Sequence, residues 1–173
     1  MPRAKPRSFT SKSQGLRNTL YSQVLTSNAI NSTSENANPT EHNANRYNAI
    51  WDTGATGTVI TQKVVDDCAL SPTGVVEVQT AAGKTKVNSY LAHVWLPNKI
   101  VVSDVEVTFG ELGHGVDVLI GMNIIGKGDF AVTNKDEKTV FSFRIPSVEH
   151  IDFVKNPFIP KPTRIIPKKR KRH

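Results

Sequence analysis

The sequence has a single cysteine, Cys68, among its 173 residues. One thiol cannot form an intrachain disulfide, so a secreted disulfide-rich scaffold is excluded. No apolar run approaches the roughly 20 residues that a membrane helix needs, and the N-terminus MPRAKPRSFT lacks the hydrophobic stretch of a signal peptide. We therefore expect a cytoplasmic protein that does not associate with a membrane.

Aromatic residues are also scarce, at 7%, while prolines number ten. A chain of this length has room for one compact domain plus tails, which excludes a large multidomain enzyme. The five histidines show no metal-ligand spacing, and with one cysteine they predict no structural zinc site. Glycine-rich motifs that would hold a nucleotide phosphate are incomplete, because Gly83-Lys84-Thr85 lacks the required glycine at Val78. We expect neither a metal nor a cofactor.

Positive charge is unevenly distributed along the chain. Residues 1–50 carry 6 basic and 2 acidic side chains, residues 51–146 carry 8 and 11, and residues 147–173 carry 8 and 2. Basic ends around an acidic middle argue against a nucleic-acid-binding face on the folded domain. The terminal PKKRKRH could be a nuclear import signal, a tail that binds polyanions weakly and without specificity, or a solvated terminus.

Composition divides the chain into three parts. Residues 1–45 are rich in Ser, Asn and Thr and predict a disordered or loosely docked polar and basic segment, in which residues 16–24 could form a short helix or strand. Residues 46–146 are dense in Val, Ile and Thr with turn residues between short runs, which is typical of an all-β domain. Residues 147–173 contain several prolines and predict an extended basic tail.

Within the predicted domain, the alternation of Val76, Val78 and Thr80 with polar residues predicts a β-hairpin whose tip lies near Ala82 and Gly83. Two short helices are also expected. One follows Thr61 as a possible N-cap, and the other lies in the sequence GMNIIGKG after residue 120.

Two motifs carry the functional signal. Asp52-Thr53-Gly54-Ala55 follows an apolar strand, and about 65 residues later Asp117-Val118-Leu119-Ile120-Gly121 precedes the second short helix. The chain has, in this order, a strand, the sequence DTGA, a hairpin with a glycine tip, a strand that ends in glycine, and a short helix. This order resembles that of the retropepsin-like aspartic proteases over residues 47 to 145. The resemblance implies a small, closed-barrel-like acid protease fold that acts as a homodimer.

The same resemblance implies the chemistry and the site. These enzymes hydrolyse peptide bonds with a water molecule held between two aspartates, and two carboxylates so close share one proton. A chain with one DTG must therefore obtain the second aspartate from a second copy, which makes Asp52 the catalytic residue of a homodimer with polypeptide substrates. Residues implied to support the catalytic loop are Thr53, Gly54, Ala55 and Gly121, and those implied to bind substrate are Gly54, Thr56, Ala81, Ala82, Gly83 and Lys84.

Simpler interpretations remain open at each position. Asp52 could be a turn aspartate, Thr53 an ordinary strand threonine, and Gly83 only a hairpin glycine. Thr56 and Gly57 stand where retroviral members commonly carry acidic residues, which leaves the peptide contacts there open. The chain could also be a non-catalytic homodimeric module that keeps the fold and binds peptides, or a nucleic-acid-associated protein that works through its basic tail.

Overall fold

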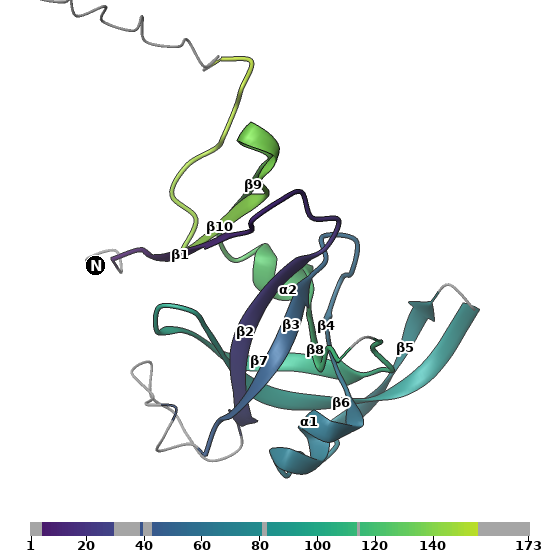
Figure 1. The fold of residues 1–173 in the computed structure, drawn as a ribbon. Helices are drawn as coiled ribbons and strands as arrows, with labels where there is room; N and C mark the ends of the chain where they lie inside the picture. The colour runs from purple at the N-terminus through teal and green to yellow at the C-terminus, as the bar shows by residue number, and fades with distance from the viewer. Residues whose placement is uncertain (1–4, 30–38, 40–42, 81–82, 114, 156–173) are drawn as a thin grey trace, which may run out of the picture.

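The computed structural model describes residues 5–29, 39, 43–80, 83–113 and 115–155 (Figure 1). These residues form ten strands, namely β1 (Arg7–Lys12), β2 (Leu20–Asn28), β3 (Asn45–Trp51), β4 (Thr58–Ile60), β5 (Gly74–Thr80), β6 (Gly83–Leu96), β7 (Ile100–Phe109), β8 (Val118–Ile120), β9 (Asp129–Thr133) and β10 (Val140–Ile145). The helical elements are short: α1 (Gln62–Asp67), α2 (Met122–Ile125) and the 3-10 helix η1 (Lys135–Glu137). The predicted all-β class and the two short helices are confirmed.

A closed barrel forms the centre of the molecule. The strand order of the larger sheet is β2-β3-β8-β4-β7-β6-β5, and a further antiparallel pairing of β2 with β6 closes six of these strands into a ring. The seventh, β5, pairs with β6 in a hairpin that projects from the barrel (Figure 1). Closure pairs the backbone of the ring strands with one another, so β5 is left as the edge strand.

A second, smaller sheet with strand order β1-β10-β9 packs against the barrel. Trp51, the last residue of β3, joins the two sheets, because its indole stacks on Phe130 at 5.6 Å with an interplanar angle of 5°. Phe9 and Phe143 contact the same indole at centroid distances of 5.6 and 5.2 Å. This aromatic cluster fixes the end of β3 at the point where the candidate catalytic loop begins.

The expectation of a disordered segment over residues 1–45 is wrong for residues 7–12 and 25–28, which form β1 and the end of β2, while the start of β2 lies in the stretch where the sequence allows a short helix or strand. The segment folds because it is completed by distant strands: Phe9 is buried among aromatic side chains, and β2 pairs with both β3 and β6. Thr26 and Ser27 are buried although they are polar. Sequence composition alone therefore underestimated the folded part, since backbone pairing does not require apolar side chains.

The C-terminal segment leaves β10 along an ordered path before the described residues end at 155. Asp129 accepts hydrogen bonds from the Ser147 hydroxyl, from the Val148 backbone N–H at 2.9 Å and from the Arg144 guanidinium at 2.6 and 2.8 Å. These donors, led by Ser147, lower the pKa of Asp129 to about 2. Residues 156–173, which hold most of the predicted basic tail, lie outside the described residues.

Candidate active site

Asp52 lies on an exposed loop that connects β3 to β4. β3 runs parallel to β8 with Trp51 opposite Ile120, and the Asp52 backbone N–H donates to the Ile120 carbonyl at 3.0 Å. The two motifs found in the sequence are therefore adjacent strands of the barrel. The loop starts at a rigid point, because Trp51 beneath it is buried and hydrogen-bonded to Ser22 at 2.9 Å.

The loop turns back on itself immediately after Asp52. The Gly54 backbone N–H donates to Asp52 Oδ1 at 2.8 Å, and the Ala55 N–H donates to the Asp52 carbonyl at 3.3 Å. The first of these bonds fixes one carboxylate oxygen relative to the backbone, while the side chain stays exposed. Such a carboxylate can contact a substrate or a second protein copy.

Gly121 and the start of α2 hold the other end of this loop. A Cβ atom at Gly121 would overlap the Gly57 carbonyl oxygen and would lie 3.0 Å from the Ala55 carbonyl oxygen. The two residues after Gly121 then bond to the loop, because the Met122 N–H donates to the Ala55 carbonyl at 2.8 Å and the Asn123 N–H to the Thr56 carbonyl at 3.0 Å. A glycine at position 121 thus permits the close contact that makes these bonds.

Asn123 stands where the family resemblance leads us to expect an acidic or amide side chain, and its contacts give it a central position that the sequence did not indicate. Its Oδ1 accepts a hydrogen bond from the Thr58 hydroxyl at 2.7 Å, and its Nδ2 donates to the Glu106 carbonyl at 2.9 Å. The same Thr58 hydroxyl oxygen accepts from the Gly121 N–H at 3.3 Å. Asn123 therefore connects α2 with β4 and β7. The sequence did not indicate these contacts, because the partners lie 17 and 65 residues away.

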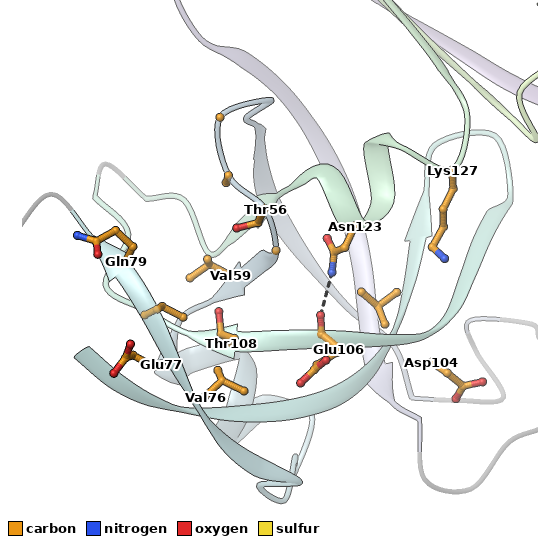
Figure 2. Close-up of a pocket in the computed structure, with 15 residues that line it drawn as sticks. Thr56, Val59, Val76, Glu77, Gln79, Asp104, Glu106, Thr108, Asn123 and Lys127 are labelled. Atoms are coloured by element: carbon orange, nitrogen blue, oxygen red, sulfur yellow. Dashed lines mark hydrogen bonds between the residues drawn. The ribbon is translucent and has the colours of Figure 1, made fainter. Parts of the chain in front are cut away.

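A cleft of about 580 Å³ lies beside this loop (Figure 2). One side is the loop from Gly54 to Gly57 with Asn123 and Lys127, and the others are β5 and β7. Val59, Val76, Val78 and Val105 supply apolar lining, and Glu77, Asp104 and Glu106 supply carboxylates. The cleft has the dimensions of a ligand site, with apolar walls and a few polar groups.

Asp52 and Thr53 line a different hollow, also of about 580 Å³, on the other side of the loop. Trp51, Phe130, Val132 and Leu20 contribute to it. Val132 on β9 is 43% exposed, so part of this apolar surface contacts solvent in a single chain. The loop therefore separates the cleft from a second hollow with mixed polar and apolar lining.

The predicted hairpin is present as β5 and β6, paired with Val78 opposite Thr85 and Thr80 opposite Gly83. Gly83 has φ +117°, a conformation that L-residues with a side chain rarely adopt. Lys84 pairs with Glu77 across the hairpin at 2.8 Å. Gly83 and Lys84 lie at the hairpin end and not in the lining of the cleft. Ala81 and Ala82, the expected tip, lie outside the described residues.

A second polar cluster surrounds α1. Lys63 forms an ion pair with Asp67 at 2.8 Å, which raises the pKa of Lys63 and lowers that of Asp67. The Tyr47 hydroxyl donates to Asp67 at 3.1 Å, and burial raises the pKa of Tyr47. Cys68, Val64 and Val65 are buried beneath this cluster. The contacts join α1 to β3 and serve the fold rather than the cleft.

Two further absences concern the described part of the chain. Within residues 5–155, apart from the short undescribed stretches, no three His, Cys, Asp or Glu side chains are placed to share a metal ion. None of the helices described is long and apolar enough to cross a membrane.

Comparisons with known proteins give the following matches. The family model for the gag-polyprotein putative aspartyl protease matches residues 39–127. Among solved structures, a retropepsin-like aspartic protease from Rickettsia conorii aligns with 12% identity and a TM-score of 0.47, over 84% of this chain and 99% of that one. The protease of Simian Foamy Virus (mac) aligns with 20% identity and a TM-score of 0.37, over 47% of this chain and 81% of that one. No curated protein sequence matches.

Proposed function

Because the chain belongs to the gag-polyprotein aspartyl protease family, we propose that its protease-type function is that of an aspartic endopeptidase whose catalytic group is Asp52. The single observation that carries the proposal is the position of this carboxylate. It is exposed on a loop that is held by Gly121 and α2, between a ligand-sized cleft and a second hollow that Asp52 itself lines.

The proposed reaction needs two carboxylates. One accepts a proton from water while the other, protonated, donates to the scissile carbonyl, and the attack of that water breaks the peptide bond. Two aspartates about 3 Å apart cannot both be ionised, so one proton is shared between them. Asp52 of one chain meets these requirements when Asp52 of a second copy faces it. No metal or cofactor takes part in this scheme.

A homodimer is thus part of the proposal, and the hollow beside Asp52 supports it. The hollow has both polar and apolar lining, and its apolar part, which includes the exposed Val132, is suited to contact with a second protein copy. We propose that the second copy covers the hollow and the exposed side of β9. In this arrangement Thr53, which lines the same hollow, hydrogen-bonds across the two-fold axis and holds the two loops together.

Polypeptide is the proposed substrate; part of it occupies the cleft, and its scissile bond lies across the loop within reach of Asp52. β5 is the edge strand of its sheet within the described residues, so its outer backbone groups can pair with an extended peptide. Gly54 and Thr56 contact that peptide from one side, and the β5–β6 hairpin, with Ala81, Ala82, Gly83 and Lys84 at its end, closes over it as a flap.

The alanine at position 55 bears on the pH at which the proposed activity is maximal. In two-lobed, pepsin-like enzymes a serine stands at the corresponding position, and its hydroxyl would favour the charged carboxylate and lower the pKa of the pair. Alanine cannot donate this bond. We therefore expect maximal activity well above about pH 3, since the ordinary aspartate pKa is near 3.9.

The experiment compares purified wild type with Asp52→Asn, on an unfolded protein substrate between about pH 3 and about pH 8. Asp66→Asn is the matched control, because Asp66 is an exposed carboxylate on α1 that contacts only Gln62 among the bonds described. We expect cleavage by wild type and by the control and none by Asp52→Asn. Sedimentation of the same samples measures the dimer.

Two results would contradict the proposal. Equal cleavage by Asp52→Asn would remove Asp52 from the mechanism. A wild-type protein that is folded and dimeric but inactive at every pH would favour the non-catalytic peptide-binding module instead.

A further inference from the structure

The side of the cleft formed by β7 presents a carboxylate at a defined position. Glu106 alternates with the buried residues Val105 and Val107, so its side chain lies on the solvent side of β7. The parallel pairing of Thr58 with Val107 brings Glu106 level with the start of β4, next to Gly57. The backbone at Glu106 is held by the hydrogen bond from Asn123, shown in Figure 2.

Negative charge predominates in the cleft. Glu77, Asp104 and Glu106 line it, with Lys127 as the one basic residue of the lining that is described. Glu77 is already paired with Lys84 of the hairpin at 2.8 Å. Neither Asp104 nor Glu106 forms an ion pair with any residue that the structure describes. A cation that enters the cleft is therefore attracted to the β7 side.

The walls of the cleft suit the remainder of a basic side chain. Val59, Val76 and Val78 line it, and aliphatic stems of lysine and arginine pack on such surfaces while the charged end stays near polar groups. An extended peptide paired to β5 would direct alternate side chains into the cleft. One subsite can thus take a basic side chain while its neighbours take apolar ones.

We propose that this cleft selects polypeptide segments in which lysine or arginine accompanies apolar residues, and that Glu106 is the residue that determines this specificity. The inference rests on the proposed function and adds to it the class of substrate. Asp104, two residues earlier on the same strand, adds to the negative potential. Glu106 touches the substrate side chain and not the scissile bond.

Cleavage specificity tests the proposal directly. A peptide library prepared from a proteome is digested, and the frequency of lysine and arginine near the cleaved bonds is compared with that in the undigested library. The samples are wild type, Glu106→Gln, Glu106→Lys and Glu111→Gln. Glu111 is the matched control, an exposed glutamate in the loop after β7 that does not line the cleft.

We expect wild type to enrich basic residues at one position by roughly three- to tenfold, the range from an exposed ion pair to a charge-assisted hydrogen bond. Glu106→Gln loses the enrichment, Glu106→Lys shifts it toward Asp and Glu, and Glu111→Gln keeps it. Raising the salt concentration lowers it, because exposed charges are screened. A wild type without enrichment, or a Glu106→Gln variant that retains it, overturns the inference.

A binding measurement separates this inference from the proposed catalysis. Two fluorescent peptides, identical except for lysine or norleucine at one position, are titrated into the Asp52→Asn variant with and without Glu106→Gln. Tighter binding of the lysine peptide that disappears with Glu106→Gln supports the inference, even where wild type cleaves nothing and the proposed catalysis is rejected. Equal affinities, or no binding of either peptide, overturn it.

Discussion

Replacement of Gly121 by alanine tests whether the loop after Asp52 depends on the close contact between Gly121 and the backbone of Gly57. The backbone of Gly121 has φ −98°, which any residue can adopt, so the substitution introduces only a steric conflict. The added Cβ would lie 2.5 Å from the Gly57 carbonyl carbon and closer still to its oxygen. Ordinary carbon contacts are about 3.5 to 4.0 Å, so loop and strand must separate by about 1 Å.

The cost of this separation can be worked out from the contacts. Overpacking a well-packed site typically costs about 1 to 3 kcal/mol. The bonds from Met122 to Ala55 and from Asn123 to Thr56 would lengthen, and each contributes about 0.5 to 1.5 kcal/mol. We therefore expect Gly121→Ala to lower the free energy of unfolding by about 2 to 4 kcal/mol, the sum of strain and partly lost bonds. A 1 Å displacement near the reacting groups can also reduce the rate about a hundredfold.

Urea unfolding followed by linear extrapolation measures the first effect, and kcat/KM for a peptide substrate measures the second. Gly113→Ala is the matched control, because a Cβ there meets no atom within 4 Å. If Gly121→Ala changed the free energy of unfolding by no more than Gly113→Ala, the steric argument would be refuted. Loss of activity without loss of stability would show that the loop moves at no cost to the fold.

Two further predictions concern Trp51, which packs against the second sheet, and Asp129, which belongs to it. Trp51→Ala should lower the free energy of unfolding by about 3 to 5 kcal/mol in urea titrations, because removal of a buried indole between two sheets leaves a large cavity. A change below about 1 kcal/mol would mean that the sheets do not depend on this contact. Asp129 has a pKa of about 2 in the folded chain against an ordinary 3.8, so its contribution to stability is complete above about pH 4 and is lost as the pH falls toward 2. Stability curves of wild type and Asp129→Asn should therefore converge on acidification, and a constant difference from pH 7 to pH 2 would contradict this assignment.

Local sequence determined the elements whose contacts are close along the chain. The β5–β6 hairpin follows from alternating apolar residues on either side of a turn, and α1 and α2 follow from short apolar groupings after Thr61 and Gly121. The order of the motifs around Asp52 and Gly121 was sufficient to indicate the family. Each of these features depends on side-chain periodicity or on residue types that a turn requires.

Strands β1 and β2 were decided by the tertiary structure. Their polar residues give little hydrophobic signal, and their stability comes from pairing with strands outside the segment. β1 pairs with β10 near the other end of the domain, and β2 pairs with β3 and β6. Burial of Phe9 against Trp51 adds to the stability of β1. Segment composition cannot report such backbone partners, so β1 and the second half of β2 were not predicted.

Part of the candidate site could be identified from the sequence, and part of it depends on the tertiary structure. Asp52 and the glycines around it were identifiable from the sequence, because backbone turns and a solvent-exposed carboxylate require those residue types. The link through Asn123 and the position of Glu106 beside the cleft were not, because they arise from the register of β4 on β7 and from hydrogen bonds across the barrel. Sequence alone thus indicated the proposed reaction, while folding determined which side chains line the cleft, since only strand register brings residues remote in the chain to one surface.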